Sequence, residues 1–430
     1  MAEVIKAGEI GKGSTIIGYP KVYKNNLLFG NTEGEFYCLN KNNGKEKWKN
    51  HLGGKILGSP SAKNNSIYIG TGKYLYKLDK NGKGIWRFKT GGVVSGLTLY
   101  KDLVLFVSTD NCLYITDKKG NLKLKYRTGD EVFVNPTIHK DKIYFGSSDG
   151  HFYCIDFKGK LEWKFNTDGE ISTFDGFDIV DEKLYFGASN YYIYCIDLKG
   201  NLVWKKRTGD VPFSTPRVDG ENLYIGGRDG NFYCLDKDTG KEKWIFKFYT
   251  GCYSTPVIKN NRVYFGTAYP RNLFLSLNKT TGKKIWSFKA TSGVATPALE
   301  KTKEYICCGN GSVFCINKEG EKLWHTKTGS GKPADLTKAI PPPKVNPDAL
   351  KDMIKEQLEL EEPFEDTYER GTVIRRDEIS QEEYASLREL GGYQKPNSGV
   401  TKYKGSPDEE KRKREKKEKE EFFLRRQGRM

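Results

Sequence analysis

The sequence has few of the residues from which catalytic and metal sites are usually built. Only four histidines occur in 430 residues, and they stand at unrelated repeat positions without the spacing of a metal site: His51, His139, His151 and His325. There is no glycine-rich phosphate-binding loop and no nucleophile elbow. These absences lead us to expect a protein that is not an enzyme, with no catalytic residue, metal, cofactor or small-molecule substrate.

Long apolar runs are also absent. No stretch of 18 apolar residues exists, so we expect no membrane-spanning helix. The first residues, 1–6, contain neither a basic region followed by an apolar core nor a lipidation cysteine. We therefore expect a protein that is not secreted through a signal peptide and that lies in the cytoplasm or within a virus particle.

What the sequence does contain is a repeat, marked most clearly by tryptophan. One position recurs every 38 to 42 residues and is occupied by Trp48, Trp86, Leu124, Trp163, Trp204, Trp244, Trp286 and Trp324. All seven tryptophans of the chain fall at this position, and leucine takes it in the third repeat. A period of this length indicates a repeat architecture, so we assign these eight residues a structural role.

Each repeat has the pattern of four short strands. In the fourth repeat, the β-branched and aromatic runs 135–139, 142–146, 152–155 and 161–165 are separated by turn residues. Such a pattern is typical of a sandwich, a barrel or a propeller blade. One four-stranded sheet cannot bury both of its faces, but eight sheets stacked radially can cover one another. The repeat therefore predicts an all-β, eight-bladed β-propeller of four-stranded antiparallel blades.

The turn before each fourth strand begins with Asp or Asn and contains a later glycine. Its first residues are Asn40, Asp79, Asp117, Asp156, Asp197, Asp236, Asn278 and Asn317. A ring of ligands is the functional interpretation of these side chains. Turn capping is favoured, because an Asx side chain bonds backbone groups two residues on and glycine readily adopts positive φ.

Residues 234–244, with the sequence CLDKDTGKEKW, carry a family resemblance. They resemble the repeat of pyrroloquinoline-quinone-type (PQQ-like) propellers, usually written Ala-x-Asp-x-x-Thr-Gly-x-x-x-Trp, with Cys in the Ala position. The resemblance covers about residues 16–328 and implies the propeller fold. It implies less about function, because that family includes quinone-dependent dehydrogenases, a lipoprotein of the outer-membrane barrel-assembly machinery and many non-enzymatic scaffolds. We interpret the chain as a non-enzymatic member.

The cysteines support that interpretation. Five of them share one strand position in different repeats, where they are too far apart to bridge: Cys38, Cys154, Cys195, Cys234 and Cys315. We expect small buried thiols in a reducing compartment. In the quinone-dependent dehydrogenases of this family, an adjacent cysteine pair forms a ring disulfide against the quinone. Cys307 and Cys308 align instead with a strand, where neighbouring side chains point to opposite faces, so we expect no bond between them.

Three departures from the repeat stand out. Residues 3–7 resemble the end of a repeat, and we expect them to form a strand beside blade eight. Leu97 and Phe177 replace the proline that opens the other repeats. The seventh repeat has two extra residues in its middle loop, 268–272, which contains an aromatic residue, a proline and an arginine. This loop could mark a contact surface, although a harmless insertion is the favoured interpretation.

The net charge of +17 lies entirely on the repeats. Residues 331–430 contain 22 Lys and Arg and 22 Asp and Glu, so they are neutral. A domain with this charge should prefer polyanions or acidic protein surfaces as neighbours, and a lysine-rich solvated surface explains the charge equally well.

The composition divides the chain into a propeller (1–330), a proline-rich linker (331–345) and a C-terminal arm with short amphipathic and charged helices (346–430). We expect the ring to be complete within 1–330. The amphipathic segments of the arm are too short to build a core of their own, so we expect them to fold on a partner or on the side of the propeller. The expected partner-binding residues are Leu350, Met353, Ile354, Leu358, Tyr384, Leu387, Leu390, Phe422, Phe423 and Leu424. A possible polyanion-binding run contains Lys411, Arg412, Lys413, Arg414, Lys416 and Lys417, although interleaved glutamates favour a solvated helix.

Three functional hypotheses follow. The first is a non-enzymatic scaffold that mediates protein–protein contacts in a larger assembly and is tethered through its arm, for example as a structural component of a virion or tail. The second is a nucleic-acid-associated protein that uses the basic propeller surface and the basic C-terminal helix. The third and least favoured is a quinone-dependent dehydrogenase.

Overall fold

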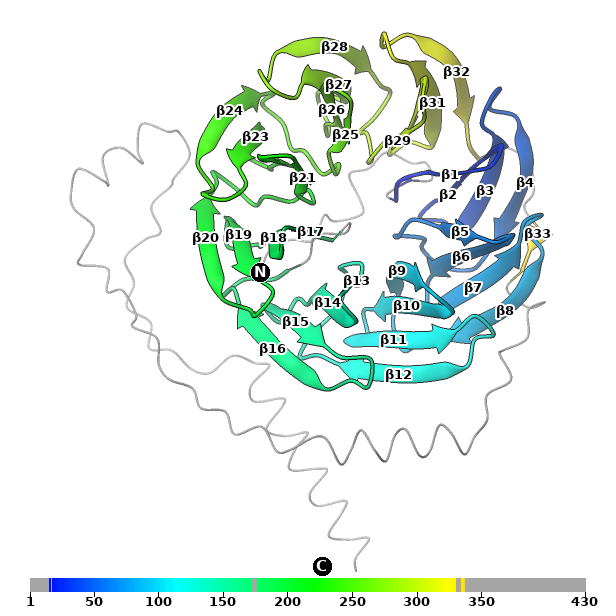
Figure 1. Cartoon of the computed structure of the whole chain (residues 1–430). Coiled ribbons are helices and arrows are strands. Elements are labelled where there is room, and N and C mark those ends of the chain that lie inside the picture. The colour runs from blue at the N-terminus through cyan, green and yellow to red at the C-terminus, as the bar shows by residue number, and fades with distance from the viewer. Residues whose placement is uncertain (1–14, 17, 172–175, 330–333, 337–430) are drawn as a thin grey trace, which may run out of the picture. The chain divides into compact units, whose positions relative to one another are not determined.

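A computed structural model describes residues 15–16, 18–171, 176–329 and 334–336. The expectations for residues 3–7, for the partner-binding residues of the arm and for the basic run 411–417 lie outside these residues. The described residues form eight β-sheets arranged around a ring (Figure 1). The eight-bladed propeller predicted from the repeat is therefore confirmed.

The first four blades follow the chain in order. Blade 1 has β1 (Lys21–Tyr23), β2 (Asn26–Gly30), β3 (Glu35–Asn40) and β4 (Glu46–His51). Blade 2 has β5 (Ser61–Lys63), β6 (Ser66–Thr71), β7 (Tyr74–Asp79) and β8 (Gly84–Lys89). Blade 3 has β9 (Val94–Tyr100), β10 (Leu103–Ser108), β11 (Cys112–Asp117) and β12 (Leu122–Arg127). Blade 4 has β13 (Thr137–His139), β14 (Lys142–Gly146), β15 (His151–Ile155) and β16 (Leu161–Asn166).

The last four blades continue the pattern. Blade 5 has β17 (Asp178–Val180), β18 (Lys183–Gly187), β19 (Tyr192–Asp197) and β20 (Leu202–Arg207). Blade 6 has β21 (Arg217–Asp219), β22 (Asn222–Gly226), β23 (Asn231–Asp236) and β24 (Glu242–Lys247). Blade 7 has β25 (Val257–Lys259), β26 (Arg262–Gly266), β27 (Leu273–Asn278) and β28 (Lys284–Lys289). Blade 8 has β29 (Ala298–Leu299), β30 (Lys303–Cys307), β31 (Ser312–Asn317) and β32 (Lys322–Lys327).

Within each blade the strands pair antiparallel in chain order, with the first strand nearest the centre of the ring and the fourth at its outside (Figure 1). The second and third strands are almost entirely buried, because both of their faces pack against neighbouring blades. The fourth strands alternate exposed and partly buried residues. This is the burial expected when single sheets stack face to face around a ring.

The repeat position joins each blade to the next. Trp163 of blade 4 donates its indole N–H to the carbonyl oxygen of Leu198 in blade 5 at 2.9 Å. Its ring lies over Gly200, where an added Cβ would stand 2.9 Å from the indole and where φ is +86°. Leu124 lies in the same way over Gly159. The turn glycine is therefore required both by the backbone and by the ring of the preceding blade.

All eight Asx residues cap their turns, as predicted. Asp156, for example, accepts hydrogen bonds from the backbone N–H groups of Lys158 and Lys160 at 2.8 and 2.9 Å. The bond to the N–H two residues on occurs at each equivalent residue: Asn40, Asp79, Asp117, Asp197, Asp236, Asn278 and Asn317. The ligand-ring interpretation has no support in this geometry, because these side chains are used by their own turns.

The repeated cysteines are buried free thiols that lie opposite the tryptophans. Each is the cross-strand partner of the tryptophan in its own blade, as Cys154 is of Trp163. A small residue leaves room for the indole. Where Leu124 replaces tryptophan, its partner is the larger Ile115. Cys307 and Cys308 are also free, and they belong to different apolar clusters on the two faces of blade 8.

One strand beyond residue 330 also belongs to the propeller. β33 (Ala334–Asp335) pairs in parallel with β4, at the outer edge of blade 1. Leu336 donates its backbone N–H to the carbonyl of His51 at 3.0 Å and packs against the core between blades 1 and 2. The eight blades close within 1–330 as expected, but the chain remains attached to the ring for a few residues more.

Within the part of the chain that the structure describes, no helix is long and apolar enough to cross a membrane.

Candidate functional site

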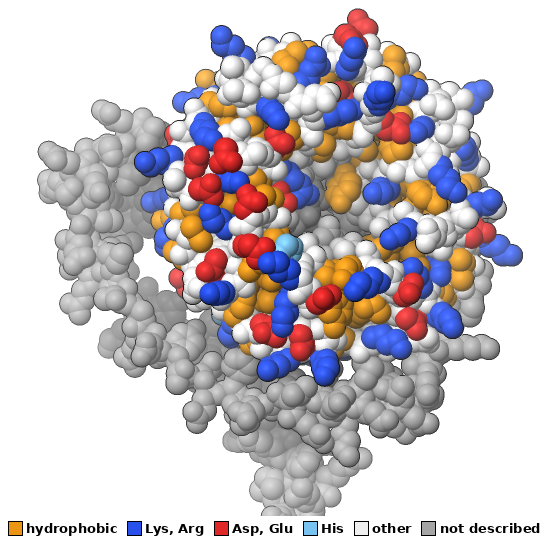
Figure 2. Space-filling view, viewed as in Figure 1, with side chains coloured by type: hydrophobic (Ala, Val, Ile, Leu, Met, Phe, Trp, Pro, Cys, Tyr) orange, Lys and Arg blue, Asp and Glu red, His pale blue; other side chains and the backbone are white. Residues whose placement is uncertain are grey.

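The eight repeat residues assigned a structural role all lie between blades. The residues that we expected to bind a partner or a polyanion do not lie in the described part of the chain. The propeller itself has three candidate surfaces: the charged face of Figure 2, the central pocket and the loops of blades 6 and 7.

Figure 2 shows one face of the ring. Lys and Arg side chains are spread around it, and Asp and Glu side chains gather on the side of blades 5 and 6. In these blades, carboxylates pair with lysines of the following blade, as Asp181 does with Lys237 and Asp219 with Lys279. Lys183 also pairs with Asp238, at 2.6 Å. Much of the acidic charge here therefore serves contacts between blades.

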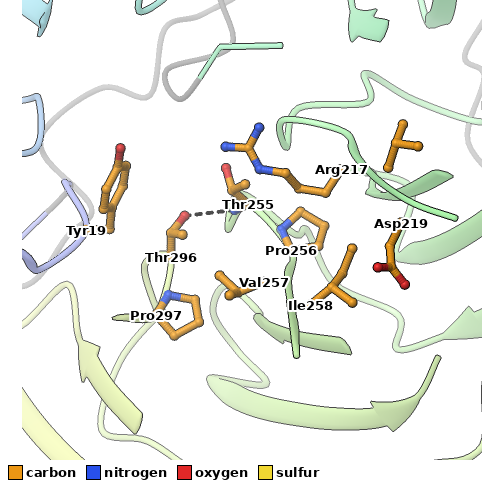
Figure 3. Close-up of a pocket in the computed structure, with 10 residues that line it drawn as sticks. Tyr19, Arg217, Asp219, Thr255, Pro256, Val257, Ile258, Thr296 and Pro297 are labelled. Atoms are coloured by element: carbon orange, nitrogen blue, oxygen red, sulfur yellow. Dashed lines mark hydrogen bonds between the residues drawn. The ribbon is translucent and has the colours of Figure 1, made fainter. Parts of the chain in front are cut away.

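A pocket of about 400 Å³ opens on the inner wall of the ring, among the first strands of blades 6 to 8 and Tyr19 (Figure 3). Thr255 donates its backbone N–H to the hydroxyl of Thr296 at 2.8 Å, which joins blades 7 and 8. Arg217 lies 3.9 Å from Asp178. Asp219, also in the lining, pairs with Lys279. The charged groups of this pocket thus already have partners within the ring.

No reactive centre stands out among the described residues. They contain no group of three His, Cys, Asp or Glu side chains that could hold a metal ion. Burial raises the pKa of the repeated thiols, to about 11 for Cys154 and about 12 for Cys195, so they are protonated at neutral pH. His325 stacks on Phe314 with ring centroids 4.4 Å apart, as a packing residue does.

The third surface lies on the side of the ring that we call the loop face. It contains the loops between the second and third strands of each blade and the loops that lead from one blade to the next. Both kinds of loop emerge at the same end because successive strands are antiparallel. Hydrogen bonds such as Ser148 N–H to the Glu131 carbonyl, at 2.9 Å, connect them.

In blades 3, 4 and 6 an aspartate joins the two loops. Asp110, Asp149 and Asp229 each accept a hydrogen bond from the backbone N–H of a glycine in the preceding inter-blade loop, at 2.7, 2.8 and 3.1 Å. Each also accepts one from a tyrosine hydroxyl on the third strand of its own blade. These carboxylates are therefore part of the scaffold of the loop face.

Blade 7 lacks this aspartate. Its longer middle loop contains Tyr269, Pro270 and Arg271 instead, with a cis peptide bond before the proline. The joining bond is replaced by one from the Thr250 hydroxyl to the carbonyl of Tyr269 at 2.9 Å. Lys289 donates to the carbonyl of Arg271 at 2.6 Å.

Backbone bonds also fix both ends of this loop. The N–H of Asn272 donates to the Ala268 carbonyl at 2.9 Å, and that of Ala290 donates to the Asn272 carbonyl at 2.8 Å. Leu273 donates its N–H to the hydroxyl of Thr267 at 2.9 Å. The loop is thus held as firmly as the shorter loops that it replaces.

Exposed aromatic residues lie in this loop and in the loop that is hydrogen-bonded to it. Tyr269 is 81% exposed, Tyr249 76% and Tyr253 37%, and all three belong to loops of blades 6 and 7. Phe213, from the preceding inter-blade loop, contacts Tyr253 edge to face with ring centroids 5.1 Å apart. We call Phe213, Tyr249, Tyr253 and Tyr269 the tyrosine patch.

A set of radial four-stranded blades, joined by tryptophans that lie over turn glycines, defines this protein as an eight-bladed PQQ-like β-propeller. More specifically, the chain belongs to the family described as outer membrane protein assembly factor BamB, whose model matches residues 11–205 and 189–340. No curated protein matches the sequence.

Solved structures agree on the fold. The computationally designed protein Ika8 has a TM-score of 0.62 and 15% identity, over 71% of this chain and 98% of its own. BamB from Moraxella catarrhalis has a TM-score of 0.55 and 16% identity, over 64% of this chain and 89% of its own. At such identities the likeness concerns the fold alone.

Sequence reasoning found only part of the tyrosine patch. It noted the loop 268–272 and favoured a harmless insertion. The structure adds that the loop is firmly held, and that Tyr249 and Tyr253, 16 to 20 positions earlier in the sequence, lie in loops beside it. One sequence signal could have pointed here: residues 243–299 contain no Asp or Glu but nine Lys and Arg.

Proposed function

We propose that this protein is a non-enzymatic scaffold that binds a protein partner through the tyrosine patch. The observation that carries the proposal is the exposure of Tyr249 and Tyr269 on loops fixed by hydrogen bonds at several points. Exposed rings on a fixed backbone bind a partner with little loss of conformational entropy. Membership of a family described as an assembly factor supports a role in protein assembly.

The composition of the patch supports a protein partner. Tyrosine and arginine are enriched in the parts of protein interfaces that contribute most to affinity, whereas lysine and acidic residues are depleted there. A tyrosine ring buries a large apolar area and still offers its hydroxyl to a hydrogen bond. Two tyrosines more than three-quarters exposed on neighbouring loops are difficult to explain by the stability of the ring alone.

The arm supplies a second contact in this proposal, supported by sequence alone. Its apolar residues, among them Leu350, Met353 and Ile354, would bind another subunit and tether the ring within the assembly. The chain ends its described contacts with the ring at Leu336, on blade 1. The proposed setting is an assembly in the cytoplasm or in a virus particle.

A nucleic-acid-associated role is the alternative, and one surface favours it. A shallow groove on the outside of blades 5 and 6 contains Lys205, Lys206, Arg207 and Lys241. Glu242 lies in the same groove and pairs with Lys206 at 2.8 Å, which lowers its positive potential. Binding to nucleic acid that weakens steeply with salt would favour this alternative.

Co-purification of the full-length chain from its own cells tests the scaffold proposal. The patch variant carries Tyr249→Ser and Tyr269→Ser, and the matched control carries Leu202→Ser and Leu323→Ser, which are also exposed apolar residues. We expect the wild type and the control to retain the same protein partners and the patch variant to lose at least one. Identical partners for all three proteins would contradict the proposal.

A further inference from the structure

We infer that the tyrosine patch recognises an acidic, extended segment of a partner protein. This inference rests on the proposed scaffold function and specifies the chemistry of the partner. It follows from the charges around the patch, which differ from those on the equivalent loops of blades 3, 4 and 6.

Blade 7 is free of carboxylates. Residues 243–299, which include its four strands and both tyrosine-bearing loops, contain nine Lys and Arg and no Asp or Glu. The loop-face segments of blade 8, 290–297 and 308–311, add none. Lys247 and Arg271 are exposed beside the two most exposed tyrosines, and Lys289 places its ammonium group on the carbonyls of the Tyr269 loop.

The absence of acid here distinguishes blade 7 from three other blades. In blades 3, 4 and 6 the equivalent loops contain Asp110, Asp149 and Asp229. Blade 7 has lost the aspartate together with the bond that it makes, and the loop is stabilised by uncharged and cationic donors instead. Without this aspartate, the potential around the exposed aromatic rings is positive. A positive potential is complementary to carboxylates on a partner.

The aspartate in the equivalent loop of blade 6 is already used by the scaffold of the loop face. Asp229 accepts bonds from the N–H groups of Gly209 and Asn231, at 3.1 Å each, and from the hydroxyl of Tyr233. Asp229 of blade 6 lies on one side of the patch, and Asp149 and Asp110 follow on the same side in blades 4 and 3. A bound acidic segment would therefore be confined to the tyrosine patch and the loops of blade 8.

These features favour a protein segment over nucleic acid. Three cations are few for a polyanion that carries a phosphate at every residue, and the aspartates of blades 3 to 6 would repel a strand that continued past the patch. A short peptide with alternating acidic and aromatic or apolar side chains needs only a few cations and gains from stacking on the tyrosines. The patch supplies both kinds of contact.

The test uses fluorescently labelled poly(Glu,Tyr), a random copolymer of four glutamates to one tyrosine, and the full-length chain. Binding is measured by fluorescence anisotropy at low salt. The charge variant carries Lys247→Glu and Arg271→Glu. Its matched control carries Arg207→Glu and Lys241→Glu, two exposed cations of the outer groove, so both variants change the net charge equally. A third variant, Tyr249→Ser with Tyr269→Ser, removes the rings without changing charge.

We expect the charge variant to bind the copolymer at least tenfold more weakly than the wild type, and the control to lose less than twofold. The ring variant should lose about as much as the charge variant, and Lys247→Arg with Arg271→Lys should bind like the wild type. Unchanged thermal unfolding midpoints and near-ultraviolet circular dichroism would show that each variant is folded.

Three results would overturn the inference. The first is no binding of the copolymer, and the second is an equal loss in the charge variant and its control, which would indicate diffuse attraction. The third is tighter, patch-dependent binding of single-stranded poly(U), which would identify nucleic acid as the ligand. If any of these occurs while tyrosine-dependent partners still co-purify with the chain, the scaffold function stands and only the acidic partner is wrong.

Discussion

Trp324 in the last blade donates its indole N–H to the carbonyl oxygen of Lys41 in the first blade, at 3.1 Å across 283 sequence positions. The same lysine pairs through its ammonium group with Glu300 of blade 8. Trp163 makes the same indole bond to the following blade, at 2.9 Å. The contact that closes the ring between blades 8 and 1 is therefore the same as the contact between other neighbouring blades. Among the described residues, all four strands of blade 8 come from one continuous segment of the chain.

Because the indole contacts of Trp324 and Trp163 are equivalent, removing either ring should lower the free energy of unfolding by the same amount. Trp324→Ala and Trp163→Ala should each lower the free energy of unfolding by about 3 kcal/mol, the lower end for a large aromatic residue, because both rings are only partly buried. Chemical denaturation of the two variants measures the difference. A far larger loss of unfolding free energy for Trp324→Ala would show that the contact between blades 8 and 1 stabilises the ring more than the other inter-blade contacts do.

The pair of Leu124 and Ile115 predicts a compensating substitution. Leu124→Trp alone should cost about 1–3 kcal/mol, because the indole meets Ile115 where most other blades have cysteine. Ile115→Cys alone should cost about 2 kcal/mol through the space that it empties. The double variant should return to within about 1 kcal/mol of the wild type, because it restores the repeat pair. Strictly additive costs in a double-mutant cycle would refute this account of the cysteines.

Glu304 predicts a pH-dependent stability. It occupies the buried position that Ile143, Leu184, Leu223 and Val263 fill in other blades, and it is 3% exposed. Burial raises the pKa of Glu304 from 4.5 to about 7, an effect only partly offset by its bond to Tyr264 and by Lys259 and Arg262. The folded state therefore binds this proton more tightly than the unfolded state does.

The contribution of Glu304 should be most favourable below pH 4.5 and should be lost as the pH rises through about 7. A shift of this size corresponds to a change on the order of 3 kcal/mol. Glu304→Gln removes the titration, so the stability of the variant relative to the wild type should increase between pH 5 and pH 8. Parallel urea unfolding curves at the two pH values, with a constant difference between the proteins, would contradict the assignment.

β33 predicts where the propeller can be cut. A chain ending at residue 340 keeps the pairing of β33 with β4 and the packing of Leu336 against the core between blades 1 and 2. A chain ending at 330 loses both, and it should be less stable by about 1–2 kcal/mol, the cost of a partly buried leucine and its backbone bonds. Equal unfolding midpoints for the two truncations would show that β33 contributes nothing.

The fold could be predicted from the sequence because its determinants recur. Tryptophan, Asx and glycine each stand at one position of the repeat, and each position has a single physical role. The tyrosine patch could not be predicted in this way, because it depends on where one blade departs from the pattern. The loops of Tyr249 and Tyr269 are joined by bonds from the Thr250 hydroxyl to the Tyr269 carbonyl and from the Ala268 N–H to the Gly251 carbonyl.

Glu304 escaped sequence reasoning for a related reason. Only the strand register shows that this glutamate fills a position that is apolar in the other blades, because β30 begins with two charged residues, Lys303 and Glu304. β33 was missed because two residues carry too little pattern to indicate a strand.

Site-specific photo-crosslinking tests the central claim most directly. A photoreactive phenylalanine analogue is placed at position 269 of the full-length chain in its own cells, and at the exposed position 323 as the control. The account predicts a discrete, protease-sensitive and nuclease-resistant adduct from position 269 that is absent from position 323. No adduct at 269, the same adducts at both positions, or an adduct removed by nuclease would contradict the claim that the tyrosine patch binds a protein partner.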